Sequence, residues 1–261
     1  MNLTDIIGRL RQKIRKRQGR PTNHFPFAER QIPASQAMQS LEEFPSDLAE
    51  IFFRHDGRVV HKWLHYLDVY SREFARYRNK ADVNFLEIGV FKGGSLEMWR
   101  KYFGPDAKIC GVDINPDCAD YVDAPNQVRI GSQADPAFLR GVVEEMGRPD
   151  IILDDGSHVA THQQVSFETL WPLLNHNGLY VIEDLHTAYF PGFNEGGYQR
   201  RGTAIEVAKQ IVDDMHGWYH PKKPLFADKN EVASVRFYDS IVVIEKQKVP
   251  MPSHMQVGQV S

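Results

Sequence analysis

The chain has 261 residues, of which 42% are hydrophobic, and a formal net charge of −3 at neutral pH. This length and composition suit one globular domain with an accessory segment and a full hydrophobic core. The net charge excludes a general nucleic-acid-binding protein. Two cysteines, Cys110 and Cys118, form no disulfide framework and fit a reducing compartment. Without an apolar run of about 20 residues or a visible signal peptide, we expect a cytoplasmic protein.

The first 17 residues have the periodicity of an amphipathic helix with a basic polar face. Its apolar residues are Leu3, Ile6, Ile7, Leu10 and Ile14. Such a helix is typical of segments that lie peripherally on anionic membranes, and a solvated terminal helix or an oligomer contact is the alternative. We expect a basic helix and arm over residues 1–55, a main domain over 56–248 and a flexible tail over 249–261.

Residues 58–78 carry apolar and aromatic side chains at helical spacing, which predicts a helix with a broad apolar stripe. His61 and His65 lie four positions apart on this stretch. That spacing can bind a metal ion, although such histidines more often lie at the surface or form hydrogen bonds.

From residue 83 onward, short apolar runs alternate with helical patterns. Strands are expected at 83–90, 108–114, 127–132, 150–155 and 178–184, and helices near 94–103, 135–146, 160–174 and 203–218. This alternation predicts an α/β fold with a parallel sheet covered on both faces. Residues 233–248 add two strands around a turn at 238–240. The expected fold is therefore a Rossmann-like, doubly wound, seven-stranded and mostly parallel sheet with a C-terminal antiparallel hairpin and an N-terminal helical segment.

The turn after the first expected strand is rich in glycine. It runs from Glu87 through Gly89 and Gly93 to Ser95, where the next helix begins. The glycines permit a tight turn and a close approach of the backbone to a ligand. Their spacing differs from the G-x-G-x-x-G pattern of dinucleotide-binding proteins. The turn resembles instead the E/D-x-G-x-x-x-G turn of S-adenosylmethionine-dependent methyltransferases, and this resemblance implies a nucleoside-containing ligand.

The ends of the second and third strands offer further polar groups to such a ligand. Asp113 ends the second strand, where a carboxylate can accept both hydroxyls of a ribose; a helix N-cap is the alternative. Ser132 and Gln133 follow the third strand, at a position suited to an adenine edge. Asp135, before Pro136, can equally be a plain helix cap.

Acidic residues end the fourth and fifth strands, at Asp154-Asp155 and at Glu183-Asp184. These strands are expected to be neighbours, so their carboxylates meet and repel one another unless a hard cation such as Mg²⁺ relieves the charge. Side chains alternate along a strand, so only one residue of the first pair is expected to be a ligand. His158 follows closely and can take a proton at neutral pH.

Five stretches together resemble a known family: LEIGVFKGGSLEMW, GVDI, GSQADPAFL, DIILDDGSH and NGLYVIEDLHTAYFPGF. They are similar to the metal-dependent sugar O-methyltransferases that act on the deoxysugars of mycinamicin and tylosin, and to rhamnosyl and mannosyl O-methyltransferases. Proteins labelled cephalosporin hydroxylases share the pattern, but no convincing iron site of two histidines and a carboxylate is present. The resemblance runs from about residue 55 to 247, whereas the macrolide enzymes have an additional N-terminal domain.

The resemblance implies a class I S-adenosylmethionine-dependent methyltransferase. It assigns Mg²⁺ to Asp155, Glu183 and Asp184, and the role of general base to His158. The cofactor is expected at Glu87, Gly89, Gly93, Ser95, Asp113, Ser132, Gln133 and Asp155. Relatives also suggest a homo-oligomer.

The implied reaction is methylation of a sugar or glycoside hydroxyl, whose pKa a bound metal ion lowers. The long loop at 186–202 carries Tyr189, Phe190, Phe193 and Tyr198 among Gly and Pro residues. Such a loop suits stacking on a sugar and closing over it, or is a packed surface loop. The competing hypotheses are a catechol-like acceptor, a metal-dependent hydrolase without S-adenosylmethionine, and a binding protein that has lost catalysis.

Overall fold

The structure, a computed structural model, describes residues 26–78, 80–191, 195–221, 223–224 and 230–258. Within these residues, seven strands form one sheet in the order β3-β2-β1-β4-β5-β7-β6. The strands are β1 (Asn84–Ile88), β2 (Lys108–Asp113), β3 (Gln127–Ile130), β4 (Ile151–Asp154), β5 (Gly178–Ile182), β6 (Val232–Tyr238) and β7 (Ile241–Lys246). The first five are parallel, and β7 runs antiparallel to β5 and to β6. The predicted mostly parallel sheet with a C-terminal hairpin is confirmed.

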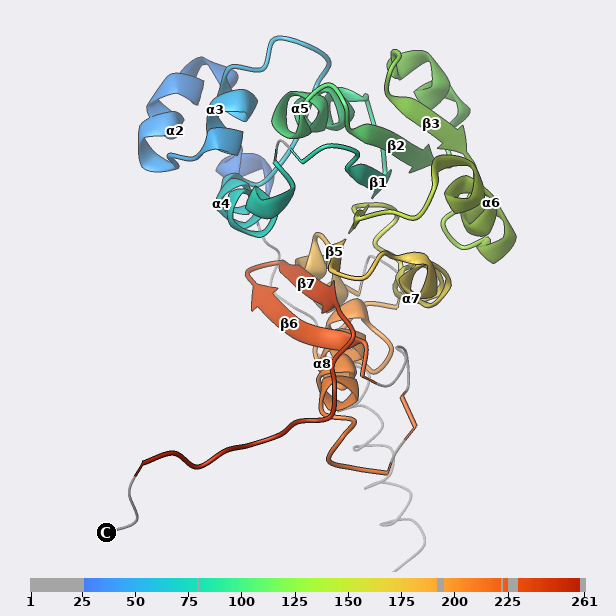
Figure 1. Ribbon diagram of the computed structural model, residues 1–261. Helices are drawn as coiled ribbons and strands as arrows, with labels where there is room; N and C mark the ends of the chain where they lie inside the picture. The colour runs from blue at the N-terminus through green and yellow to red at the C-terminus, as the bar shows by residue number, and fades with distance from the viewer. Residues whose placement is uncertain (1–25, 79, 192–194, 222, 225–229, 259–261) are drawn as a thin grey trace, which may run out of the picture.

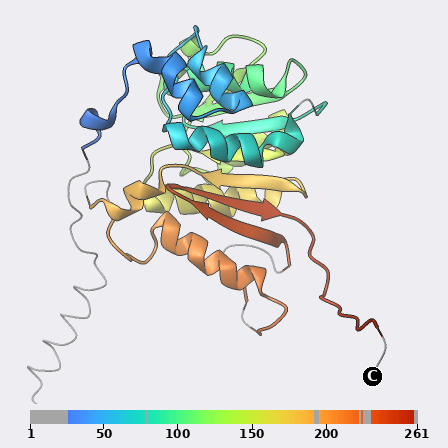
Figure 2. The same ribbon diagram turned by 90° about the vertical axis from the view of Figure 1, so that its left-hand side faces the viewer.

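Helices cover both faces of this sheet (Figures 1 and 2). The α-helices are α2 (Ala37–Glu43), α3 (Asp47–Phe53), α4 (Leu64–Glu73), α5 (Gly94–Phe103), α6 (Pro136–Met146), α7 (Ala160–Leu170) and α8 (Ala204–Met215). Short 3₁₀ turns are η1 (Ala28–Arg30), η2 (Ala34–Gln36), η3 (Ala75–Tyr77), η4 (Pro116–Tyr121), η5 (Trp171–Leu173) and η6 (Leu185–Tyr189). Helices α3 to α5 lie on one face and α6 to α8 on the other, which gives the doubly wound arrangement.

Successive side chains of each strand point to opposite faces of the sheet, and this alternation explains why each face has its own hydrophobic cluster. Phe85 and Ile151 belong to the hydrophobic cluster shared with α4 and α5, whereas their neighbours Leu86 and Ile152 belong to the cluster on the α6 and α7 side. Both faces of the central strands are therefore apolar, as a buried parallel sheet requires. The polar side chains of these strands lie at or near the strand ends, where the candidate site is located.

The helix predicted over residues 58–78 is shorter than expected. The chain runs without helical structure up to Trp63, α4 begins at Leu64, and a 3₁₀ turn follows it. The backbone amide of Arg58 donates a hydrogen bond to Glu97 at 3.0 Å rather than within a helical turn. Consequently His61 and His65 do not share a helical face, because His61 precedes the helix. His65 Nε2 lies instead 3.2 Å from the carbonyl oxygen of Asp239, in line with the hydrogen-bonded alternative.

The predicted basic helix over residues 1–17 lies outside the described residues, so its contact with a membrane or a partner subunit stays a prediction. Among the described residues, no helix is long and apolar enough to cross a membrane.

Helix α3 contributes Leu48 and Ala49 to the core beside α4 and α5. After β7 the chain leads away from the sheet in both views (Figures 1 and 2).

Candidate active site

The glycine-rich turn after β1 requires its glycines for steric reasons. Gly89 has a φ of +96°, and a Cβ there would overlap the carbonyl oxygen of Asp155. Gly93 has a φ of +81°, and a Cβ there would overlap the carbonyl oxygen of Tyr121. Gly89 therefore lets the ends of β1 and β4 approach each other, and Gly93 does the same for the turn and the segment at Tyr121. The binding of a ligand at this turn stays a prediction.

Asp113, at the end of β2, fixes the conformation of this turn. Its Oδ2 accepts hydrogen bonds from the amides of Val90 at 2.9 Å and Phe91 at 3.2 Å, and its Oδ1 accepts one from Asn115 at 2.9 Å. The side chain is partly exposed, so it also faces the space beyond the strand ends. The structure thus places the predicted ribose-binding carboxylate beside the glycine-rich turn.

Glu87 and Ser95, both predicted to contact the cofactor, lie beneath the turn and contact each other. Ser95 Oγ donates to Glu87 Oε2 at 2.7 Å, and the indole of Trp99 donates to Oε1 at 3.3 Å. Burial raises the pKa of Glu87 to about 7, against the opposing pull of Lys62. The side chain of Glu87 is fully buried, so these residues support the turn from inside.

Gln133 bridges two segments of the site. Its amide nitrogen donates to Asp154 Oδ1 at 3.1 Å, and its amide oxygen accepts from the backbone of Ser157 at 2.6 Å. Ser132 Oγ accepts a local hydrogen bond from the amide of Ala134 at 3.1 Å. The amide of Gln133 is thereby committed to protein partners. Its predicted contact with adenine, and that of Ser132, stay predictions.

The two aspartates that end β4 have different environments, as strand alternation predicted. Asp154 is fully buried, accepts hydrogen bonds from Gln133 and from Ser166 at 2.7 Å, and has a pKa that burial raises. Asp155 is partly exposed and faces the candidate site. Asp154 is therefore structural, and Asp155 is the acid available to a ligand.

Asp155, His158 and Asp184 form the candidate metal and catalytic cluster. One potential ligand atom from each lies within 4.8 Å of the other two. His158 Nε2 is 3.6 Å from Asp184 Oδ2, and both residues have a left-handed backbone, with φ near +55° in each. The turns after β4 and β5 therefore bring these groups together, as the order of the strands predicted.

Lys62 contacts the acids of the candidate site, although the sequence did not indicate it. Its Nζ lies 2.6 Å from Asp155 Oδ2, 2.7 Å from Glu183 Oε1 and 3.9 Å from Glu87 Oε1. Burial disfavours its charge, but Asp155, Glu183 and Glu87 prevail and raise the pKa of Lys62 well above its usual value. Glu183 thus pairs with Lys62 in this structure, and its predicted role as a metal ligand stays a prediction.

Two further side chains contact Asp184. The hydroxyl of Tyr66 donates to Oδ1 at 2.6 Å, and Nδ1 of His186 lies 3.9 Å from the same oxygen. Neither residue carried a signal in the sequence, because Tyr66 follows the apolar pattern of α4 and His186 lies in a loop. The hydrogen bond from Tyr66 holds Oδ1 of Asp184, whereas His158 Nε2 approaches the other oxygen, Oδ2.

An aromatic cluster adjoins this site through His186. The ring of His186 lies 5.6 Å from Phe27, 5.5 Å from Trp63 and 5.8 Å from Phe190, measured between centroids. Phe27 comes from the N-terminal arm and is 40% exposed. Phe190 belongs to the predicted substrate loop. The cluster therefore joins three separate segments beside the acidic groups.

The rest of the predicted substrate loop is partly packed on itself. Tyr189 and Tyr198 stack with a centroid distance of 6.2 Å, and Phe193 lies outside the described residues. The carboxylate of Glu195 accepts a hydrogen bond from the amide of Thr161 at 2.8 Å, at the start of α7. The loop therefore rests on the helix that begins next to His158.

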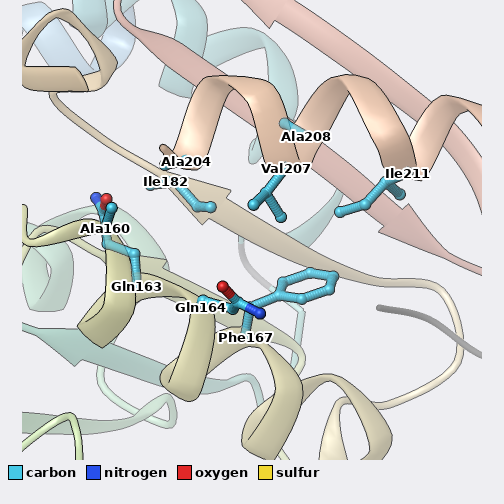
Figure 3. A pocket seen from close by; sticks show the side chains of 9 residues that line it. All are labelled: Ala160, Gln163, Gln164, Phe167, Ile182, Ala204, Val207, Ala208 and Ile211. Carbon is cyan, nitrogen blue, oxygen red and sulfur yellow. The ribbon is translucent and has the colours of Figure 1, made fainter. Parts of the chain in front are cut away.

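A small apolar cavity lies elsewhere, between α7 and α8 (Figure 3). Phe167, Ile182, Val207 and Ile211 are among its lining residues. It contains no carboxylate or histidine, so it belongs to the hydrophobic packing of the two helices rather than to the chemistry.

Comparison with known proteins agrees with this geometry. Residues 86–185 match the family model of a methyltransferase domain. The chain is 41% identical over 215 residues to the 8-demethyl-8-(2-methoxy-alpha-L-rhamnosyl)-tetracenomycin-C 3'-O-methyltransferase of Streptomyces olivaceus, which covers 77% of this chain and 54% of that protein. It is 37% identical over 220 residues to the mycinamicin VI 2''-O-methyltransferase of Micromonospora griseorubida, covering 77% and 52%.

A solved structure shares both fold and sequence with this chain. The MycE methyltransferase from the mycinamycin biosynthetic pathway, in complex with Mg and SAH, superimposes with a TM-score of 0.68 at 32% identity. The match covers 77% of this chain and 55% of MycE. The chain thus spans about half the length of the relatives it matches. It is a homologue of the macrolide and tetracenomycin sugar O-methyltransferases and has the class I fold of S-adenosylmethionine-dependent methyltransferases.

Proposed function

We propose that this protein transfers the methyl group of S-adenosylmethionine to a hydroxyl of a sugar or glycoside, with Mg²⁺ bound and His158 as the general base. The observation that carries the proposal is the convergence of Asp155, His158 and Asp184 within 4.8 Å, beside the glycine-rich turn. Relatives named for methylating sugars of tetracenomycin and mycinamicin support the same acceptor class.

The donor set suits a magnesium ion. Asp155 and Asp184 supply the carboxylate oxygens that this hard cation prefers, and the predicted third acid, Glu183, lies directly before Asp184. An imidazole suits softer metals better, which leaves His158 available for proton transfer. When bound, Mg²⁺ supplies the Lewis acidity that makes an adjoining hydroxyl easier to deprotonate.

In this proposal His158 accepts the proton of the acceptor hydroxyl. As the hydroxyl oxygen bonds to the methyl carbon, the bond between that carbon and sulfur breaks and S-adenosylhomocysteine leaves. The proton passes to the imidazole, and Asp184, with Oδ2 at 3.6 Å from Nε2, pairs with the imidazolium. Tyr66 keeps the carboxylate in that orientation through Oδ1.

The cofactor is assigned to the glycine-rich turn and the ends of β2 and β3. The partly exposed carboxylate of Asp113 lies beside the turn, where a ribose would bind. Phe91 and Ile114, 61% and 72% exposed, present apolar side chains next to Asp113, which suits a purine ring.

The acceptor is assigned to the aromatic cluster, with Phe190 and Tyr189 of the substrate loop closing over the sugar.

Transfer of labelled methyl groups from S-adenosylmethionine tests this function. We expect product with rhamnosides or related deoxysugar glycosides, dependence on Mg²⁺, and loss of turnover in EDTA. Transfer to catechols but to no glycoside would change the acceptor class. Turnover unaffected by EDTA would remove the metal ion from the mechanism.

A further inference from the structure

Lys62 occupies a position that packing alone does not explain. Its side chain is 2% exposed, and it reaches the carboxyl ends of β1, β4 and β5 from the extended segment before α4. An ammonium group in such a position costs several kcal/mol of desolvation unless it is paired. Here it contacts Asp155 and Glu183 at hydrogen-bond distance and approaches Glu87.

The same carboxylates border the candidate metal site. Asp155 contacts Lys62 through Oδ2, and a carboxylate oxygen of Asp155 lies within 4.8 Å of ligand atoms of His158 and Asp184. Glu183 uses Oε1 for Lys62 and is itself almost fully buried. The buried ammonium of Lys62 and the metal cluster therefore share the carboxylate of Asp155, and Glu183, the second partner of Lys62, directly precedes Asp184.

We propose that Lys62 is a positioning residue of the metal site, which fixes the orientation of Asp155 and Glu183 and offsets part of their negative charge. This inference rests on the proposed function, since it concerns the ion assigned there. It has two consequences. The acidic site keeps its geometry when no ion is bound, and the ion binds less tightly than it would to the uncompensated carboxylates.

The size of the second effect follows from simple electrostatics. A cation and an ammonium that share one carboxylate repel each other, and this repulsion is stronger in a partly buried site than in water. Removing the ammonium is therefore expected to tighten Mg²⁺ binding about tenfold or more. Removing the ammonium also makes the stability of the folded state depend more strongly on the ion, because a ligand that binds only the folded state stabilises that state.

The experiment measures Mg²⁺ binding by calorimetry, and thermal unfolding with Mg²⁺ or EDTA, all with S-adenosylhomocysteine present. Lys62→Met is expected to bind Mg²⁺ at least about tenfold more tightly than the wild type and to gain more in Tm from the ion. Lys62→Arg retains the positive charge and is expected to restore wild-type values. Lys246→Met is the matched control, because the Lys246 side chain is similarly buried, at 3% exposed, but donates to the carbonyl of Trp171 away from the site.

A second pair of variants covers the case in which Lys62→Met does not fold without the ion. Glu183→Gln alone leaves Lys62 with one acid fewer and is expected to weaken Mg²⁺ binding. Lys62→Met combined with Glu183→Gln restores the charge balance and is expected to return the affinity to within about threefold of the wild type. An affinity of the double variant equal to that of Glu183→Gln alone would overturn the inference.

The outcomes separate this inference from the proposed function. If the wild type methylates a glycoside and binds Mg²⁺, but Lys62→Met has the same affinity and the same gain in Tm, only the role of Lys62 fails. If the wild type and Lys62→Met both bind no Mg²⁺ by calorimetry, the metal ion of the proposed function fails and Lys62 has no metal site to position.

Discussion

The hydroxyl of Tyr66 donates a hydrogen bond to Oδ1 of Asp184 at 2.6 Å, across 118 residues of sequence. Burial and the carboxylate of Asp184 raise the pKa of Tyr66, so the phenol remains a hydrogen-bond donor throughout the neutral range. The contact joins helix α4 to the turn after β5. It orients the carboxylate whose other oxygen faces His158.

Replacing Tyr66 by Phe tests this orientation. The variant keeps the ring in the core but loses the hydrogen bond, so we expect Mg²⁺ to bind about tenfold more weakly, as is common for partners of metal ligands. Calorimetry with S-adenosylhomocysteine present measures the dissociation constant. Tyr77→Phe is the control, because the Tyr77 hydroxyl donates to the carbonyl of Asn177 at a distance from the site. Equal affinities in both variants and the wild type would contradict the assignment.

His158→Ala is expected to separate cofactor binding from catalysis. Loss of a general base lowers turnover by about 10²- to 10⁴-fold, whereas the binding of S-adenosylhomocysteine should not change. His162→Ala is the control: this histidine lies four residues further on, and its Nδ1 contacts Ser157 Oγ at 2.9 Å rather than an acid of the cluster. Wild-type turnover of the His158 variant would remove it as the base.

Phe27→Ala is expected to weaken acceptor binding. Its ring contacts Trp63, His186 and Phe190, so its loss removes one wall of the proposed sugar-binding surface. We expect the KM for the glycoside to rise about fivefold to tenfold, in line with the loss of one aromatic contact, with an unchanged KM for S-adenosylmethionine. Phe237→Ala is the matched control, since Phe237 is similarly exposed, at 42%, but lies on β6. Equal effects of the two changes would argue against an acceptor site at Phe27.

Glu87 makes stability depend on pH. Burial raises its pKa to about 7 from an ordinary value of 4.5, so between these values the folded protein holds a proton that the unfolded chain releases. Its contribution to stability is therefore full below pH 4.5 and is lost as the pH rises through about 7.

The variant Glu87→Gln cannot ionise. We expect its stability relative to the wild type to rise by up to about 3 kcal/mol between about pH 5 and about pH 8, measured by urea unfolding. Glu50→Gln, at an exposed position on α3, serves as the control. A difference between wild type and Glu87→Gln that does not change with pH would show that Glu87 has no raised pKa.

The sheet and the acidic cluster were predictable because they depend on local patterns. Apolar runs of strand length, separated by helical stretches, fix a parallel sheet, and the carboxyl ends of neighbouring strands must meet. Asp155 and Asp184 follow two such strands, so their proximity follows from topology alone. His158 is close to Asp155 in sequence and was found for the same reason.

Lys62 and Tyr66 were not predictable in this way. Both lie in a stretch whose apolar spacing predicts one continuous helix, and nothing local indicates that the chain stays extended up to Trp63. Their partners, Glu183 and Asp184, lie 121 and 118 residues away. Only the packing of α4 against the sheet brings them to the site. The same holds for Phe27, whose contacts come from two distant segments, at Trp63 and at residues 186–190.

The binding of S-adenosylhomocysteine, measured by calorimetry with Mg²⁺ and with EDTA, tests the central claim most directly. The methyltransferase assignment predicts binding in the micromolar range, with an affinity that Glu87 and Asp113 variants lower. No binding under either condition would contradict it, and the acidic cluster of Asp155, His158 and Asp184 would then have to serve another reaction.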